Sequence, residues 1–253
     1  MTEYIEKIKS LYDKQIFVLH LEKKVMEDEE NINSLAEQIV LFHSLGIRIC
    51  VIQDKCTSTF SSTSTSLMNA LKERNVASII VSGFSMNFME ASSFDSAPVF
   101  NLFQGNFVPI IEPIIPRWPD GKIEHIDSDE LAKRVAITLK AEKLFFVTTL
   151  LGIPCFENDT KYPILSIDFI DIEKVIQDFP EGRITKRLRL SKQILKMGFG
   201  GIILLINGCE KDNLISNTLT DKKNGTTISH LYTEKELEEL EAWVKTGPID
   251  DDL

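Results

Sequence analysis

The segment from Ile126 to Ile153 constrains the fold more than any other part of the chain. It opens with Asp127 and Ser128, either of which can cap a helix, and Glu130 lies three residues after Asp127 as in a capping box. Apolar residues then recur at helical spacing, as on a helix with one buried face: Leu131, Val135 and Leu139. The next run, 144–147, is apolar on both alternating faces. Such a run is typical of an inner strand in a parallel sheet.

The same alternation of helix and strand continues along most of the chain. Strands are predicted at residues 16–21, 47–52, 77–82, 163–167 and 202–206, of which 47–52 and 202–206 should be buried. Helices are predicted at residues 31–45, 67–74, 172–179, 185–197, 213–219 and 233–244. Because short connections join helix to strand in this order, we expect right-handed crossovers and a mainly parallel sheet. No internal repeat or linker is evident, so residues 1–253 are predicted to form a single domain of the α/β class.

The remaining segments are predicted from their local composition. Residues 1–14 should carry an amphipathic helix, and residues 246–253 should form a loose acidic tail. The polar run 56–66 is predicted to be a surface loop; it has no glycine that would let backbone amides close on a phosphate. Residues 86–106 are predicted to be irregular. The prolines within 107–115 should restrict that extended segment to a sheet edge or a strand end.

The charge and composition of the chain exclude several classes of partner. The net charge of −10 argues against nucleic acid, because phosphate binding needs a basic surface. The short basic run 186–189 is interpreted as the solvated face of a helix. The four cysteines show no C-x-x-C pair or partnered histidine spacing, so no metal site is expected. No apolar run could span a membrane, and we expect a soluble intracellular protein, cytoplasmic, or in the mitochondrial matrix if a presequence has been removed.

Four segments carry a resemblance to a known family. Residues 43–48 end a predicted helix and lead into a strand, and they resemble a first helix–strand crossover. Residues 128–143, together with Gly152, are similar to the pattern S/A-D/E-x-x-A … L-x-A-x-x-L … G-V. Residues 182–186 resemble the motif G-M-x-x-K, and residues 225–228 resemble a closing G-T-x-I strand. Because the four segments occur in this order, the sequence resembles the amino-acid kinase family. Within that family it is similar to N-acetylglutamate kinase and to the kinase-like domain of N-acetylglutamate synthase. Nothing after residue 228 resembles the acetyltransferase domain of the synthases.

This resemblance implies a fold, a reaction and a set of site residues. The fold would be a three-layer αβα sandwich around a mainly parallel sheet. The reaction would transfer a phosphoryl group from ATP, with Mg²⁺, to a carboxylate, mostly by positioning and charge neutralisation. Asp129 would orient the lysines, and Lys186 would contact the transferring phosphate. The nucleotide would lie against Thr148, Thr149, Gly152 and Gly182. The substrate would lie against Gly83, His125 and Asp127.

The phosphate-binding positions depart from the family pattern. The first strand should end in K-x-G-G, and residues 20–23 instead read His-Leu-Glu-Lys. Asp54 stands where a glycine-rich loop should follow the second strand. His125 replaces an asparagine, and Thr148 or Thr149 replaces an aspartate. Because the loss of a single transition-state donor costs about 10²–10³ in rate, these changes together argue against kinase activity.

We therefore predict a catalytically degenerate amino-acid-kinase-like protein that acts as a structural or regulatory subunit, with no cofactor or metal. It should form a homo-oligomer or join a larger protein assembly. The alternative is a divergent small-molecule kinase that uses Lys23, Asp129 and Lys186, and a third possibility is ligand sensing without catalysis. Each site residue also has a purely structural interpretation. Asp129 can be a charge at a helix N-terminus, Lys186 a solvated helix residue and His20 a core residue.

Overall fold

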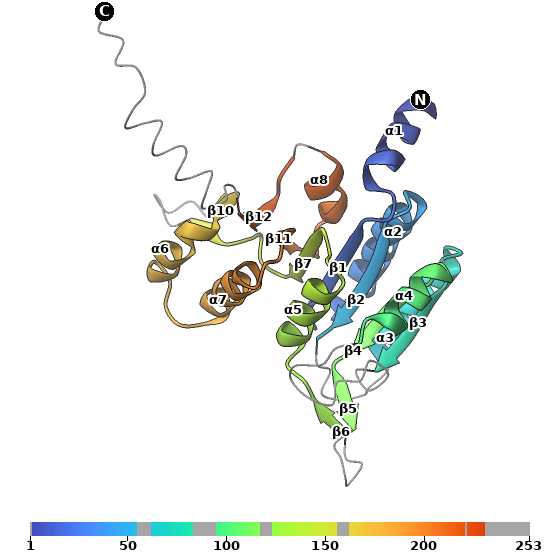
Figure 1. The fold of residues 1–253 in the computed structure, drawn as a ribbon, viewed down its shortest axis with the longest axis horizontal. Coiled ribbons are helices and arrows are strands. Elements are labelled where there is room, and N and C mark those ends of the chain that lie inside the picture. The colour runs from blue at the N-terminus through green and yellow to red at the C-terminus, as the bar shows by residue number, and fades with distance from the viewer. Residues whose placement is uncertain are drawn as a thin grey trace, which may run out of the picture.

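Eight strands form the central sheet in the computed structural model of this protein (Figure 1). The structure describes residues 2–54, 62–82, 95–116, 123–155, 162–220 and 222–230. The strands of this sheet are β1 (Ile16–Leu21), β2 (Arg48–Gln53), β3 (Ser78–Ser82), β4 (Val108–Glu112), β7 (Lys143–Thr148), β10 (Ser166–Asp168), β11 (Ile202–Asn207) and β12 (Gly225–Ser229). Their order across the sheet is β10-β12-β11-β7-β1-β2-β4-β3, and all neighbours run parallel except β11 and β12. The predicted α/β fold with a mainly parallel sheet is therefore confirmed.

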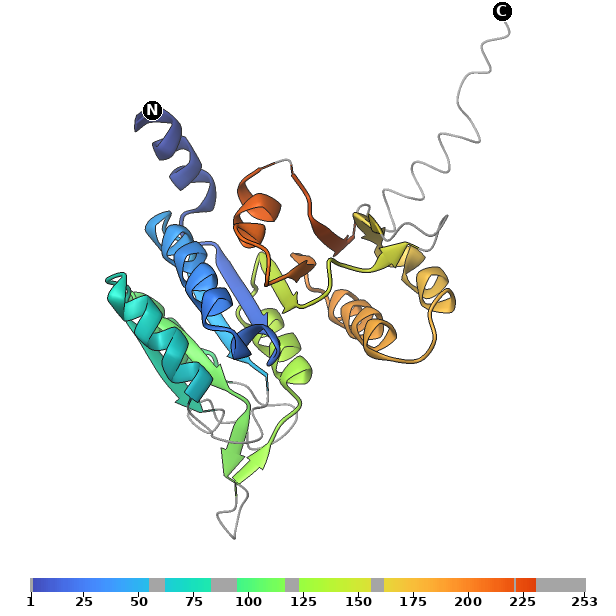
Figure 2. The same cartoon turned by 180° about the vertical axis from the view of Figure 1, so that it is seen from behind.

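Helices cover both faces of this sheet, as the two opposite views show (Figures 1 and 2). One face packs against α4 (Ala97–Gln104), α5 (Ser128–Thr138), α6 (Ile172–Gln177) and α7 (Arg183–Lys196). The other face packs against α1 (Thr2–Tyr12), α2 (Glu29–Ser44), α3 (Ser62–Glu73) and α8 (Asn213–Leu219). Each face has its own cluster of buried apolar side chains. The three-layer αβα sandwich is therefore confirmed.

Short elements complete the described chain. Two antiparallel hairpins stand apart from the central sheet: β5 (Ile114–Pro116) with β6 (Ile123–His125), and β8 (Pro154–Cys155) with β9 (Tyr162–Pro163). Single turns of 3₁₀ helix precede α2 and α6: η1 (Val25–Glu27) and η3 (Phe169–Asp171). Among the helices that the structure describes, none is long and apolar enough to cross a membrane.

The central strand β1 is buried on both faces, which explains its continuous apolar sequence. Its alternate side chains serve different layers, because successive residues of a strand point to opposite faces. Phe17 and Leu19 join the core under α2, whereas Ile16 and Val18 join the core under α5 and α7. By the same alternation, His20 points toward α5 and α7, and this polar side chain is fully buried there.

Two predictions about local structure are wrong. Ser62 to Ser66, predicted as part of a loop, form the first turns of α3. Within the segment predicted to be irregular, residues 97–104 form α4, whose proline occupies the first turn, where no intrahelical N–H donor is needed. Of the two positions predicted for the prolines of 107–115, a sheet edge or a strand end, the strand end is observed, because Pro109 is near the start of β4. This strand lies inside the sheet, between β2 and β3, and its pairs with β2 begin only at Ile110.

Other predictions fall on parts of the chain outside the described residues. These are residues 56–61 of the polar run, residues 86–94 of the segment predicted to be irregular, and Gly83. The helix predicted at 233–244 and the acidic tail at 246–253 also lie outside the described residues.

Candidate functional site

A cavity of about 420 Å³ opens at the carboxyl end of the central strands. It lies beside β1, which pairs with β2 on one side and with β7 on the other, so the strand order changes direction there. Such a switch point is where open α/β sheets place their ligands. The lining residues come from the ends of β1 and β2 and from the first turns of α5 and α7: Glu22, Asp54, Ile126, Asp127, Ser128, Asp129, Gly182, Arg183, Lys186 and Arg187.

The first turn of α5 is fixed by its N-cap. Asp127 Oδ1 accepts hydrogen bonds from the backbone N–H of Asp129 at 2.9 Å and of Glu130 at 3.4 Å. Ser128 Oγ donates to Asp54 Oδ1 at 2.7 Å and ties the helix to the end of β2. Glu130 pairs with Lys133 and Arg134 on its own helix, at 2.6 and 3.0 Å. The cap therefore holds Asp129 in a fixed place at the cavity wall.

Asp129 is the centre of the polar cluster. Its Oδ1 lies 2.9 Å from Arg187 Nη1 and 3.5 Å from His20 Nε2, and its Oδ2 lies 3.5 Å from Lys186 Nζ. Burial raises the pKa of Asp129, and the charges of Arg187 and Lys186 oppose that rise. This carboxylate thus joins three elements that are far apart in the sequence, β1, α5 and α7.

Arg187 is buried, with 5% of its surface exposed, and its contacts explain how a cation is held there. Its Cζ lies 4.2 Å from the centre of the Phe146 ring, and its Nη1 and Nη2 each lie 3.5 Å from His20 Nδ1. Burial, then the charges of Arg187 and Lys186, lower the pKa of His20 well below its ordinary value. His20 is therefore neutral, with Nδ1 facing the guanidinium as the acceptor and the proton on Nε2, toward Asp129.

The interpretation of residues 186–189 as a solvated face is wrong for Arg187. The side chains of Lys186 and Arg189 are about half exposed, as expected of that face. Arg187 instead lies on the buried face of α7, four residues before Ser191 and seven before Ile194, which are both buried. Helical spacing places these residues on one face and could have predicted its burial.

Lys186 bridges the two aspartates at the mouth of the cavity. Its Nζ lies 2.9 Å from Asp127 Oδ2 and 3.5 Å from Asp129 Oδ2. The hydrogen bond that Lys186 donates to Asp127 raises the pKa of Lys186. Partial burial would raise the pKa of Asp127, but its bonds to Lys186 and to the backbone of α5 outweigh that effect and lower it. The predicted partners Asp127, Asp129 and Lys186 are therefore brought together, beside Gly182.

A second ion pair joins the end of β1 to the start of α7. Arg183 Nη1 lies 2.6 Å from Glu22 Oε1, and Glu22 Oε2 accepts from the backbone N–H of Thr149 at 3.4 Å. Glu22 is buried, whereas half of the Arg183 side chain is exposed. Arg183 and Arg187 are not predicted as site residues from the sequence, because the partners of both lie more than 50 residues away along the chain.

The charges that line the cavity nearly cancel. Four carboxylates, those of Glu22, Asp54, Asp127 and Asp129, face the three cations Arg183, Lys186 and Arg187, so the ionised groups sum to −1. Each of these cations lies within 3 Å of a carboxylate oxygen. The cavity is therefore polar and saturated by internal ion pairs.

Four other residues predicted to bind a nucleotide or substrate, all within the described chain, do not line this cavity. Thr148 Oγ1 accepts from the N–H of Leu150 at 2.9 Å. Gly152 has φ +138°, and a Cβ there would lie 2.7 Å from Thr226 Oγ1. His125 ends β6 and pairs with Ile114. Thr149 touches the cluster only through the bond from its N–H to Glu22. The roles predicted for these residues stay predictions.

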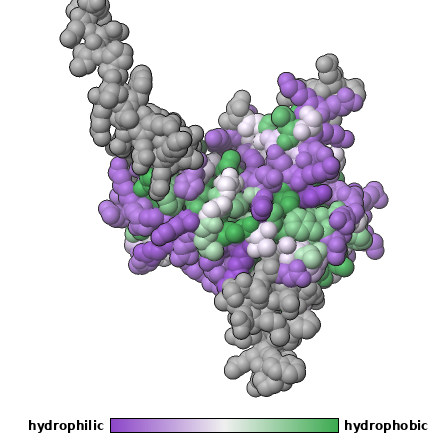
Figure 3. Space-filling view, viewed as in Figure 1, coloured by the Kyte–Doolittle hydropathy of each residue, from purple (hydrophilic) through white to green (hydrophobic). Residues whose placement is uncertain are grey.

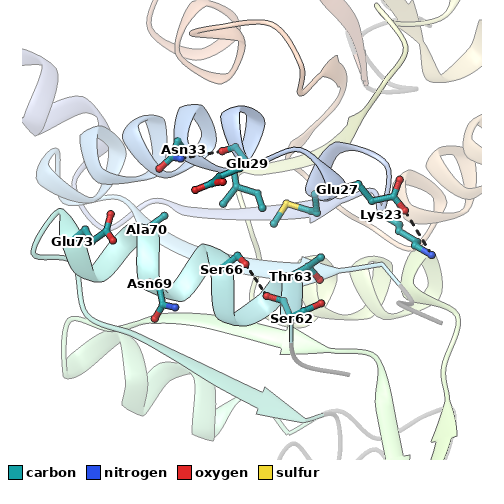
Figure 4. A pocket seen from close by; sticks show the side chains of 12 residues that line it. Lys23, Glu27, Glu29, Asn33, Ser62, Thr63, Ser66, Asn69, Ala70 and Glu73 are labelled. Atoms are coloured by element: carbon teal, nitrogen blue, oxygen red, sulfur yellow. Dashed lines mark hydrogen bonds and ion pairs between the residues drawn. The ribbon is translucent and has the colours of Figure 1, made fainter. Parts of the chain in front are cut away.

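A second hollow, of about 580 Å³, lies between α2 and α3 (Figure 4). Polar side chains of α3 such as Ser62, Ser66 and Asn69 form one wall, and Glu29 and Asn33 of α2 lie opposite. Lys23 and Glu27 close one end as an ion pair of 3.7 Å. In the described part of the chain, no group of three or more His, Cys, Asp or Glu side chains is arranged to hold a metal ion.

Comparison with known proteins gives three consistent findings. Residues 50–209 match the model of the amino acid kinase family. Acetylglutamate kinase from Halothermothrix orenii is 27% identical over 131 residues, which are 51% of this chain and 44% of that protein. The chain thus spans less than half the length of this curated relative.

Solved structures share the fold. N-acetylglutamate synthase from Neisseria gonorrhoeae, in complex with coenzyme A and N-acetyl-glutamate, superposes with a TM-score of 0.73 at 17% identity, covering 92% of this chain and 63% of that one. Carbamate kinase from Giardia lamblia, bound to AMP-PNP, gives a TM-score of 0.61 at 12% identity, covering 86% of this chain and 99% of that one.

Proposed function

Because the chain belongs to the amino acid kinase family, we propose that it is a catalytically degenerate member that serves as a structural or regulatory subunit. The observation that carries this proposal is the pairing of every cation around the cavity with a carboxylate of the same cavity. Phosphoryl transfer needs cations and backbone donors that are free to meet the charge on the phosphates. Here those charges are already neutralised within the protein.

A triphosphate fits this cavity poorly. At the end of β1, the buried carboxylate of Glu22 takes the N–H of Thr149 as its own donor. At the end of β2, Asp54 adds a second carboxylate, held by Ser128. Bringing a polyanion against a set of groups that sums to −1 would cost Coulomb energy, and it would break ion pairs that stabilise the fold.

A role in assembly is supported by the exposed end of the sheet. Strand β3 is one of the two edge strands of the described sheet, and its Ile79 is 38% exposed. Phe107, which immediately precedes the neighbouring strand β4, is also 38% exposed. An edge with apolar side chains offers both backbone hydrogen-bonding groups and a surface to bury. We propose that a second copy of the chain, or a partner in a larger assembly, covers this edge.

One observation favours the alternative of a divergent kinase. Lys186 is more exposed than the other cations of the cluster and also borders an adjoining cavity of about 640 Å³, together with Asp127, Asp129 and Gly182. A ligand entering there could reach its ammonium group. If the protein is a kinase, Lys186→Ala should abolish turnover, because this lysine would neutralise the transferring phosphate.

The experiment that separates the two functions measures binding and turnover together. Titration calorimetry with MgATP and N-acetylglutamate should show no saturable binding, and a phosphate-transfer assay should show no turnover above the protein-free rate. The control variant is Lys192→Ala, on the same helix, where the lysine pairs with Glu173. Turnover that is lost in Lys186→Ala and kept in this control would establish the kinase instead.

The size of the particle in solution, measured by light scattering, tests the assembly. Ile79→Glu should shift it toward the monomer.

A further inference from the structure

Large apolar side chains are exposed at the edge of the central sheet opposite β3. Strand β10 lies at this edge of the described sheet, beside β12 and close to α6 (Figure 1). Leu165, immediately before β10, is 50% exposed, and Ile170, two residues after the strand, is 57% exposed. The surface on the α6 side is mostly hydrophilic, with hydrophobic residues among the polar ones (Figure 3). Proteins generally cover or blunt an edge strand, so apolar side chains at both ends of one indicate a docking surface.

The described chain leaves the sheet at this same edge. Strand β12 ends at Ser229, which is in register with Asp168 of β10. The next residue, His230, packs its ring against Phe169 of η3, with 4.4 Å between the ring centres. Phe169 is the direct neighbour of Ile170. The residues that follow His230 therefore start beside the exposed apolar side chains.

The sequence that follows His230 fits such a surface. Residues 231–244 lie outside the described part of the chain, and a helix is predicted over 233–244. Its apolar residues recur at helical spacing on one face: Leu237, Leu240, Trp243 and Val244. A helix over this range is about 18 Å long. The backbone from Leu165 to Ile170 spans at most about 17 Å, so one face of the helix can reach both side chains.

The charges of the two segments also complement each other. Residues 233–244 contain five acidic residues and one basic residue, whereas α7 contains six basic residues and no acidic one. Helix α7 reaches this edge through Lys192, which pairs with Glu173 and whose Nζ lies 6.0 Å from the ring centre of Phe169. An acidic helix placed beside η3 is therefore attracted to α7.

We propose that residues 231–244 dock as an amphipathic helix over Leu165, Ile170 and the edge strand β10, with their acidic side toward α7. A segment of the same chain is favoured over a second copy, because its attachment to β12 keeps it at a high local concentration. The docked helix covers β10 and leaves β3, at the other end of the sheet, as the edge open to a partner. The docking does not depend on any function of the cavity at the carboxyl end of the sheet.

The fluorescence of Trp243 tests the docking in the full chain. The only other tryptophan, Trp118, is replaced in a Trp118→Phe background, so that all tryptophan emission comes from Trp243. This emission should be shifted to the blue of that of N-acetyltryptophanamide, and acrylamide should quench it less, because the indole is buried against apolar side chains. Adding Ile170→Ser should shift the emission to the red and increase the quenching.

Two further variants make this result specific to the proposed surface. Leu165→Ser, at the other end of β10, should act as Ile170→Ser does. The matched control is Leu41→Ser on α2, where the leucine is 37% exposed and the helix packs on the opposite face of the sheet from α7. Its emission should stay that of the background. All three side chains are partly exposed in the described chain, so their replacement leaves the buried core unchanged.

Cleavage by a glutamyl endopeptidase gives a second readout, because every acidic residue of 233–244 is a glutamate. Cleavage follows the population of the undocked segment when docking is fast. Burial of one isoleucine shifts such an equilibrium about tenfold, so Ile170→Ser should speed cleavage within 234–241 by about that factor. Leu41→Ser should leave the rate unchanged.

Three results would overturn the proposal. The first is emission and quenching of Trp243 like those of the free amide in the Trp118→Phe chain. The second is a response to Ile170→Ser no larger than the response to Leu41→Ser, which would place the segment elsewhere. The third is a loss of Trp243 protection on dilution, since a second copy of the chain would then supply the cover.

Discussion

Arg187 on α7 places both terminal nitrogens of its guanidinium 3.5 Å from Nδ1 of His20 on β1. By resemblance to the family, position 20 would carry a lysine whose charge faces Asp129. In this chain the histidine is neutral, and the cation beside Asp129 comes from the neighbouring helix. The charge that the first strand lacks is therefore supplied from α7. That arginine is buried over Phe146 at the wall of the cavity and is already paired with Asp129.

Replacing Arg187 by Met should destabilise the protein strongly. The change removes the partner of the buried Asp129 carboxylate, and breaking a buried ion pair from one side costs about 3–5 kcal/mol. Urea unfolding, followed by circular dichroism, measures the loss. Arg189→Met, two residues later on the exposed face, should change the free energy of unfolding by less than about 1 kcal/mol. Equal effects of the two changes would contradict the structural role assigned to Arg187.

The stability of the protein should fall in mildly acidic solution because of His20. Its pKa in the folded state lies well below the ordinary value of 6.5, so below that pH the unfolded chain binds a proton that the folded protein does not. Stability contributed by the neutral imidazole is thus complete above about pH 6.5 and is lost as the pH falls, by at most about 1.4 kcal/mol per pH unit.

The measurement for His20 is the free energy of unfolding between pH 7 and pH 5. His20→Gln keeps a polar side chain that does not titrate, so the difference between wild type and variant should shrink as the pH falls. The matched control is His43→Gln on α2, at a partly buried histidine outside the candidate site. If the free energies of unfolding of His20→Gln and wild type change in parallel with pH, then His20 has a similar pKa in the folded and unfolded states.

Asp127 should stabilise the protein mainly by capping α5, and less by its ion pair with Lys186. Asp127→Ala removes the acceptor for two N–H groups of α5 and should cost about 1 kcal/mol, as for other N-caps. Asp127→Asn keeps an acceptor oxygen and should cost less. Lys186→Ala removes only a half-exposed ion pair, worth about 0–1 kcal/mol. Chemical denaturation of the three variants gives the ranking, and an Asn variant as unstable as the Ala variant would argue against the cap.

The sequence predicts the layers of this protein better than its site. The strand at 16–21 and the order of helix and strand follow from apolar patterns, which report burial directly. The helix at 97–104 was missed because its surroundings are rich in Phe, Met and Ser and show no clear helical period. Lys186 and Asp129 were expected to meet, by family resemblance. The pair between Glu22 and Arg183 was not, because only tertiary structure brings residues so distant in sequence together.

The last prediction concerns the two carboxylates that stand where the family has glycines. In the double variant Glu22→Gly and Asp54→Gly, the three cations of the cavity face two carboxylates, so its charge changes from −1 to +1. Arg183 loses the partner at 2.6 Å, and the N–H of Thr149 loses its acceptor. Both become available to an incoming phosphate, and glycine allows the backbone to approach it. Calorimetry should then detect binding of MgATP that the wild type lacks, still without turnover, since His20 remains neutral beside Asp129.

The control for this double variant is Glu27→Gly with Glu73→Gly, which removes the same charge from the hollow between α2 and α3. Binding in both double variants would point to overall charge, and binding in neither would mean that the internal ion pairs are not what excludes the nucleotide.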